Sequence, residues 1–180
     1  MQAIDKTIKG ILIISSCIAI VFMVAGIYNR YIVRNISISE PLGYYLKIPV
    51  GKIEKGNRYM VCVEKKEYIE IMQSLGLPKT KNQCPYQSPY LIKQVAGVPG
   101  DMIVVNESGV FVNNIYQVNT KPILKHKQIN LNPLSDYSHR LESGEYFMLG
   151  ITRTSYDSRY FGVIKISQFQ KRVILLMNNN

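Results

Sequence analysis

The sequence predicts a mainly β, mostly antiparallel and partly closed domain with one short helix, preceded by a single N-terminal transmembrane helix. Three observations support this prediction. Gly10 to Ile27 forms an uninterrupted run of 18 uncharged residues. From Tyr44 onward, short runs rich in β-branched and aromatic residues alternate with turn signals. Only one amphipathic helical pattern follows the apolar run, whereas a parallel α/β sheet needs a helix between successive strands.

The apolar run is long enough to cross a bilayer. As a helix, 18 residues extend roughly 27 Å at about 1.5 Å per residue, close to the hydrocarbon thickness. Tyr28 and Tyr31 would then lie at the interface, where amphipathic rings are favoured. We therefore expect a short flank over residues 1–9, an anchor over residues 10–28 and one folded domain over residues 35–180.

Three alternatives to the anchor are open from the sequence. A signal peptide cleaved after Gly26 fits the small residues there, although its apolar stretch exceeds the usual length. A lipoprotein signal ending at Cys17 fits less well, because the apolar run continues through that residue. A buried soluble helix would show a polar stripe, which the run lacks.

Charge limits the partners more than it fixes the orientation. Lys and Arg number 22 against 12 Asp and Glu, which gives a net charge of +10. Nucleic acid is not the expected partner, because the basic residues are scattered and no zinc-finger or RNP-like pattern is present. An anionic membrane surface suits the surplus better. Lys6 and Lys9 before the apolar run balance Arg30 and Arg34 after it, so positive charge does not select an orientation.

The soluble part reads as a succession of strands around one helix. Tyr68, Ile71, Met72 and Leu75 follow helical spacing, and Gly76 with Pro78 ends the pattern, which predicts a helix over residues 66–75. An exposed excursion over residues 77–89 is expected after it. Turns are expected at residues 107–109 and 113–114. Strands are expected in the runs 44–50, 58–64, 91–97, 102–116, 145–151, 160–166 and 171–177.

The cysteines allow a disulfide. Cys17 belongs to the apolar run, which leaves Cys62 and Cys84 in the soluble part. Outside the cytoplasm this pair can form a disulfide, and two buried thiols are the alternative. Neither cysteine has further ligands at zinc spacing, so no metal site is expected.

Three polar patches are candidates for a functional site. In the first, S-E-P-L-G at residues 39–43, Pro41 restricts the backbone after Ser39 and Gly43 permits a tight turn. A serine before such a bend has a constrained position, as a nucleophile requires. On its own, an ordinary turn explains this patch equally well.

The second patch is L-I-K-Q-V-A-G-V-P-G-D, residues 91–101. By strand alternation Lys93 shares a face with Leu91 and Val95, so its side chain is expected to point inward. Burial disfavours the charged form of a lysine, and the neutral amine that results can accept a proton from a serine. A lysine on an edge strand that reaches solvent is the alternative.

The third patch is G-I-T-R-T-S-Y-D-S-R-Y-F-G, residues 150–162. On an extended chain Ser155, Asp157 and Arg159 would share one face, and the last two could form an ion pair. A structural ion pair beside a turn is the simpler explanation when this patch is taken alone.

Taken in order after a membrane anchor, the three patches resemble the motifs of the type I signal peptidase superfamily. The serine motif S-x-P-x-G-x-Y is most similar to that of the TraF-type conjugative-transfer peptidases, and the resemblance spans about residues 35–165. It implies a signal-peptidase-like β fold without a cofactor. It also implies a serine endopeptidase domain over residues 35–180.

The resemblance assigns roles to individual residues. Ser39 matches the nucleophile and Lys93 the general base of a Ser–Lys dyad. Ser37 matches the hydroxyl that assists the oxyanion hole, and Ser155 matches the hydroxyl that orients the lysine amine. The remaining matches are Asp157 and Arg159, the supporting ion pair.

The resemblance also implies a substrate and a location. The substrate would be an exported protein precursor, a conjugative pilin or another transfer component, cut at the periplasmic face of the inner membrane by a single-pass enzyme. Glu40 departs from the housekeeping signal peptidases, which place methionine after the serine, and Gln94 replaces a common arginine. A general preprotein signal peptidase and a non-catalytic β-domain assembly factor of a secretion apparatus are the alternatives.

A Ser-His-Asp triad is the competing catalytic arrangement. The histidines are His126 and His139, both in polar surroundings, and the sequence contains no G-x-S-x-G motif. We therefore expect both to be surface histidines.

Overall fold

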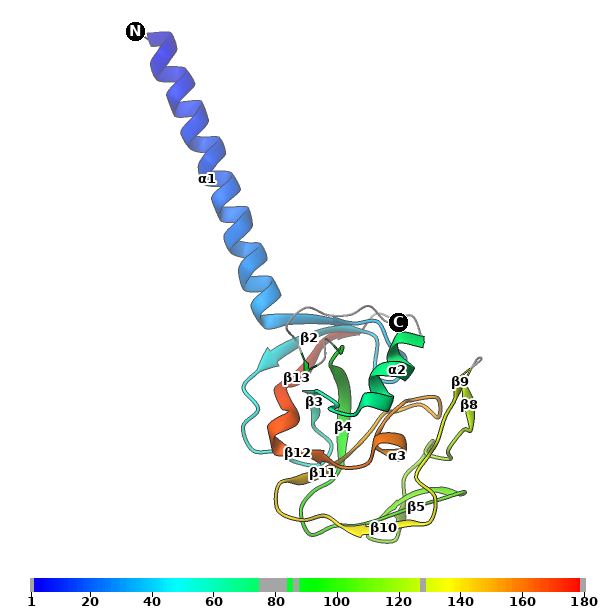
Figure 1. The fold of residues 1–180 in the computed structure, drawn as a ribbon. Helices are drawn as coiled ribbons and strands as arrows, with labels where there is room; N and C mark the ends of the chain where they lie inside the picture. Colours follow the sequence, from blue (N-terminus) through cyan, green and yellow to red (C-terminus); the bar gives the residue numbers. More distant parts are fainter. Residues whose placement is uncertain (1, 75–83, 86–87, 127–128, 179–180) are drawn as a thin grey trace.

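The computed structural model describes residues 2–74, 84–85, 88–126 and 129–178. A single long helix, α1 (Gln2–Tyr31), projects away from a β domain that contains the rest of the described chain (Figure 1). Within it, Gly10–Tyr31 has a mean hydropathy of 2.6 and is not buried against the domain, so by length and composition it can cross a membrane. The helix runs directly into the first strand, three residues beyond the expected end of the anchor.

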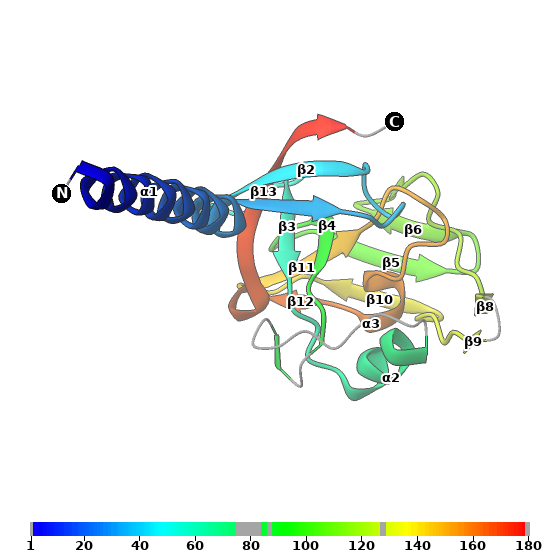
Figure 2. The ribbon, with the colours of Figure 1, turned by 90° about the horizontal axis from the view of Figure 1, so that it is seen from above.

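The domain is built on a seven-stranded sheet in the order β1-β2-β13-β3-β4-β11-β12. Its members are β1 (Ile32–Asn35), β2 (Gly43–Ile48), β3 (Arg58–Val61), β4 (Leu91–Gly97), β11 (Glu145–Leu149), β12 (Ile164–Lys165) and β13 (Phe169–Asn178). The long strand β13 pairs with both β2 and β3, and its register shifts once along each. Figure 2 shows the curvature of β13, which extra residues at such irregularities produce.

A four-stranded sheet in the order β10-β5-β6-β7 completes the domain. Its strands are β5 (Met102–Asn106), β6 (Gly109–Val112), β7 (Ile115–Tyr116) and β10 (Tyr137–Arg140), and a separate hairpin joins β8 (Lys125–His126) to β9 (Ile129–Asn130). The four-stranded sheet lies at the end of the domain far from α1, whereas β1 and β2 lie near α1 (Figure 1). Every pairing between described strands is antiparallel, which confirms the predicted fold class.

Three clusters of buried side chains form the core. The largest packs helix α2 (Lys66–Ser74) against β3, β4 and β11, and α2 contributes Tyr68 and Met72 as the helical spacing predicts. A second cluster fills the space beneath the four-stranded sheet. A third lies under β1 and β2 and includes Tyr45 and Met60.

The prediction from the sequence was wrong for one strand and did not include several other elements. Residues 160–166 do not form one strand, because Ser158–Phe161 folds as the helical turn α3 and only β12 is extended. Asp157 caps this turn by accepting a hydrogen bond from the Arg159 backbone N–H, and Gly162 ends it at φ 79°. The expected single short helix is thus joined by α3 and by the 3-10 turn η2 (Ile166–Gln168). Strands β1, β8, β9 and β10 were not predicted.

The turns fall where the sequence predicts them. Residues 107 and 108 join β5 to β6, and Asn113 and Asn114 turn the chain into β7 at φ 50° and 67°. Leu75, the last residue of the expected helix, lies outside the described residues, as does most of the expected excursion over residues 77–89.

The disulfide predicted from the sequence is formed in this structure. Cys62 follows β3, and its Cα lies 5.4 Å from that of Cys84, to which it is bonded. The bond closes a loop between residues 22 positions apart, and this loop contains α2. It therefore ties the chain just before β4 to the end of β3, close to the strand that carries Lys93.

Candidate active site

The loop that carries Ser39 joins β1 to β2 and is held by one buried side chain. Asn35, the last residue of β1, donates its Nδ2 hydrogens to the carbonyl oxygens of Ser37, Glu40 and Pro41 at 2.9, 3.0 and 3.0 Å. Its Oδ1 accepts from the Ser37 backbone N–H at 3.1 Å. Buried polar groups need hydrogen-bond partners, and the Asn35 side chain supplies them to the carbonyl oxygens of this loop, which has no regular secondary structure.

The two serines of this loop face each other. The Oγ atoms of Ser37 and Ser39 are 3.0 Å apart, and the Ser39 backbone N–H donates to Ser37 Oγ at 3.4 Å. Ser39 is half-buried and Ser37 is exposed. The loop is also tied to the segment after β11, because Ser39 O accepts from the Ile151 N–H at 2.9 Å.

Gly43 has a different role from the one the sequence suggests. It begins β2 at φ 146°, and a Cβ there would collide with the carbonyl of Met177 on β13. Glycine is therefore needed for the close approach of β13 to β2, and not for a tight turn beside Ser39.

Lys93 points into the domain, as strand alternation predicts. Only 2% of the residue is exposed, and its Nζ donates to Ser155 Oγ at 2.9 Å. Burial lowers the pKa of the Lys93 amine to about 8, and the nearby carboxylates of Asp157 and Glu40 oppose that effect. A lysine with this pKa is partly neutral near physiological pH, so it can accept a proton.

Ser39, Lys93 and Ser155 line the same pocket of about 200 Å³. No hydrogen bond in the described part of the chain joins Ser39 directly to Lys93. Catalytic hydrogen bonds are often long in the absence of substrate and shorten when it binds. Most of the lining area is apolar, and the other lining residues are Ser37, Ile38, Met72, Leu91, His126, Leu131, Thr152, Thr154 and Tyr156.

Asp157 and Arg159 form a fully buried ion pair. Arg159 Nε donates to Asp157 Oδ1 at 2.8 Å and Nη2 to Oδ2 at 2.7 Å. The pair forms across the start of α3 and not, as was expected from the sequence, along an extended strand. The Ser155 side chain does not join the pair and contacts Lys93 instead. Asp157 Oδ2 also accepts from the Gly150 N–H at 3.0 Å.

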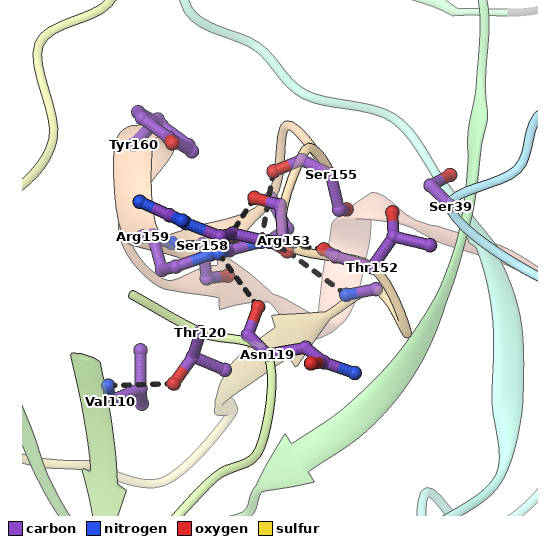
Figure 3. Close-up of polar contacts among 12 residues, drawn as sticks. Ser39, Val110, Asn119, Thr120, Thr152, Arg153, Ser155, Ser158, Arg159 and Tyr160 are labelled. Carbon is purple, nitrogen blue, oxygen red and sulfur yellow. Dashed lines mark hydrogen bonds and ion pairs between the residues drawn. The ribbon is translucent and has the colours of Figure 1, made fainter. Parts of the chain in front are cut away.

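The Arg159 guanidinium organises the loop between β11 and α3. Nη2 donates to the carbonyl oxygens of Thr152 and Ser155 at 3.3 and 3.0 Å. Nη1 donates to those of Arg153 and Asn119, both at 3.2 Å, as Figure 3 shows. The pair thus fixes the backbone that presents the Ser155 hydroxyl to Lys93.

Comparison with known proteins decides the family. Residues 5–177 match the family model described as "Signal peptidase, peptidase S26". The chain belongs to the signal peptidase S26 family. This membership makes it a serine protease of the signal peptidase type.

Two curated relatives are plasmid transfer proteins TraF from Escherichia coli. One is 28% identical over 143 residues, 74% of this chain and 76% of the relative. The other is 28% identical over 174 residues, 94% of this chain and 95% of the relative. A solved signal peptidase I from Enterococcus faecalis V583 is 18% identical, covers 70% of this chain and 97% of its own, and has a TM-score of 0.38.

Several residues around this candidate site were not assigned a structural role from the sequence. Asn35 holds the serine loop, and Glu40 pairs with Arg58. His126 is half-buried and lines the pocket, a position that the sequence did not indicate. His139 pairs with Glu145, 2.6 Å away, and does not line the pocket. Asn35 binds residues two to six positions further along the chain, but no regular periodicity marks it; His126 meets pocket residues that come from other segments of the chain.

Gly150 is a further requirement of the site. A Cβ at this position would collide with the Ser155 hydroxyl and would lie 2.8 Å from Ser39 O. We expect Gly150→Ala to displace both groups and to lower kcat per folded molecule by about 10²-fold, the cost of a misplacement near 1 Å. The measurement is precursor cleavage normalised to folded protein.

Gly97→Ala is the matched control for Gly150→Ala. A Cβ at Gly97 would lie 2.7 Å from Ile103 Cδ1 and 2.9 Å from Leu141 Cδ1, in the core beneath the four-stranded sheet. This variant should lose stability and keep its kcat per folded molecule. Equal kcat losses in the two variants would show that Gly150 acts only through stability.

Proposed function

We propose that this chain is a membrane-anchored serine endopeptidase in which Lys93 deprotonates Ser39. The observation that carries the proposal is the burial of an oriented lysine, with its pKa lowered to about 8, in the same pocket as a serine fixed by its loop. Membership in the S26 family supports it.

The proposed reaction proceeds through an acyl-enzyme. Lys93 Nζ accepts the proton of Ser39 as its Oγ attacks the scissile carbonyl carbon. The Ser39 N–H and the Ser37 hydroxyl, which already lie together, donate to the oxyanion after Ser37 turns away from Ser39 Oγ. The C–N bond then breaks, and the Lys93 ammonium returns the proton to the leaving amine. Water attacks the acyl-enzyme in the second step, with Lys93 again as base.

The anchor limits where this reaction takes place. Ser39 is eight residues beyond Tyr31, where the apolar helix ends. At about 3.3 Å per extended residue, Ser39 is at most roughly 27 Å from that end. The proposed enzyme therefore cuts close to a membrane surface. The face that we propose is the periplasmic face of the inner membrane, where exported precursors emerge.

The relatives point to the class of precursor. Both curated relatives are named plasmid transfer proteins, so the proposed substrate is a conjugative pilin or another transfer component. The test is co-expression with a candidate pilin precursor, followed by mass spectrometry of the product. A shortened pilin indicates hydrolysis, and a shortened pilin lighter by one water indicates transfer to its own amine. If none of the candidate precursors were processed, the alternative of a non-catalytic β-domain assembly factor would be favoured.

The base also predicts a pH dependence. Because the neutral amine is the active form and its pKa is lowered by burial to about 8, kcat/KM should rise with pH to a midpoint near 8. A histidine base would give a midpoint near 6.5. In the variant with both His126→Gln and His139→Gln, kcat/KM should still rise with pH to a midpoint near 8. A folded double variant without activity would contradict a lysine base.

A further inference from the structure

A carboxylate is buried directly behind the serine loop. Glu40 follows Ser39 and is only 1% exposed. Its Oε2 accepts from Arg58 Nε on β3 at 2.6 Å, while Oε1 is buried and has no hydrogen-bond partner in the described part of the chain. Burial raises the pKa of Glu40, and the Arg58 guanidinium, the Lys93 amine and the Gln94 backbone N–H oppose this effect. Buried charges are costly, so this one calls for an explanation.

Holding the serine loop does not explain this charge. Asn35 already binds three carbonyl oxygens of the loop, and Tyr45 Oη donates to Pro41 O at 2.8 Å. A buried ion pair is often no more stabilising than apolar side chains of similar volume. Glu40 therefore adds a charge where packing alone would have sufficed.

The charge lies beside Lys93. Glu40 follows Ser39, which lines the same pocket as Lys93, and the Arg58 that binds Glu40 lies opposite Gln94, the neighbour of Lys93 on β4. The two carboxylates that act on the Lys93 amine are those of Asp157 and Glu40, and Arg159 opposes them. Asp157 is engaged at both oxygens by Arg159, whereas Arg58 binds only one oxygen of Glu40. In the described part of the chain, the other titratable or charged groups that line the pocket or the adjoining core beside Lys93 include Arg58 and Tyr59 on β3, Tyr68 on α2, His126 on β8 and Tyr156 before α3.

We propose that Glu40 is a positioning residue whose carboxylate, held by Arg58, is the counter-charge for the ammonium that forms on Lys93 during catalysis. This inference rests on the proposed function of Lys93 as the base. The carboxylate stabilises the ammonium after proton transfer from Ser39. Arg58 opposes the effect of burial on the Glu40 carboxyl and so favours its ionised form.

The test uses Glu40→Gln, which keeps the size of the side chain and removes its charge. The probe is the NMR titration of the Lys93 side chain in the full-length protein in detergent, assigned with Lys93→Arg. Removing an opposite charge should lower the Lys93 midpoint by about 1 pH unit. The basic limb of acylation by a serine-reactive probe should shift equally, and the plateau rate should fall by up to about tenfold.

Two variants make the result specific. Glu145→Gln removes a carboxylate at the far end of β11, where it pairs with His139, and should leave the Lys93 midpoint unchanged. If Glu40→Gln does not fold, the double variant Glu40→Met with Arg58→Met replaces the ion pair by apolar side chains and should fold. Its Lys93 midpoint should also decrease, but by less than in Glu40→Gln, because a positive charge is removed together with the negative one.

An unchanged Lys93 midpoint in folded Glu40→Gln or in the double variant would overturn the proposal, even if stability is reduced. The NMR titration requires no catalysis, so it separates this inference from the proposed function. Failure of the function would appear as a wild-type protein that the probe does not acylate. Failure of the inference would appear as normal, Lys93-dependent acylation whose rate rises with pH at the same midpoint in Glu40→Gln as in the wild type.

Discussion

Ser39→Ala should eliminate precursor cleavage and leave the fold unchanged. The hydroxyl is the proposed attacking group, so the acyl-enzyme should not form without it. Ser39 makes its side-chain contact with Ser37, and the loop is held by Asn35 and by the Ile151 N–H, which do not involve the Ser39 hydroxyl. The measurement is processing of a co-expressed precursor, with thermal unfolding to check the fold.

Ser37→Ala is the matched control for Ser39→Ala. Its hydroxyl lies 3.0 Å from Ser39 Oγ, so the substitution changes the same loop by the same group. Loss of one oxyanion donor typically lowers kcat by about 10²–10³-fold, which leaves measurable cleavage. An inactive Ser37→Ala together with an active Ser39→Ala would place the nucleophile at Ser37.

Lys93→Met should abolish cleavage and raise the melting temperature. Methionine fills a similar volume but cannot accept a proton. The folded wild-type protein holds an amine whose pKa burial lowers to about 8, so below that pH it carries the cost of a desolvated charge. Removing the charge should stabilise the fold by roughly 1–3 kcal/mol. A structural lysine would show the opposite change in stability.

The size of this effect changes with pH in a defined window. Between about 8 and the ordinary lysine pKa near 10.4, the unfolded wild-type chain binds more protons at Lys93 than the folded chain. Stability of the wild type therefore increases with pH across this window, and the advantage of Lys93→Met should narrow. Melting temperatures measured at pH 7 and pH 10 test this. If the difference in melting temperature between Lys93→Met and the wild type were the same at both pH values, the Lys93 pKa would not be lowered.

The sequence predicted the parts of the site that depend on local pattern. Alternation along residues 91–97 was sufficient to predict that Lys93 points inward, because Lys93 lies between Leu91 and Val95 on the face of β4 that packs on the core. The ordered motifs were sufficient to select Ser39, Ser155 and Asp157 as candidates. Their roles stay predictions until the variants are measured.

The parts that escaped prediction depend on tertiary contacts. Asp157 and Gly162 close a helical turn where β propensity favours a strand, so Asp157 meets Arg159 by a different geometry from the expected one. Glu40 finds Arg58 on a strand 18 residues further along the chain. Gly150 is needed because the serine loop and Ser155 converge on it, which no single segment of sequence reveals.

The most direct test of the Ser–Lys dyad is mass-spectrometric peptide mapping of the full-length protein after reaction with a serine-reactive acylating probe. The account predicts one adduct, on Ser39, that is absent from Lys93→Met at neutral pH. An adduct on another residue, or an undiminished Ser39 adduct in Lys93→Met, would contradict it.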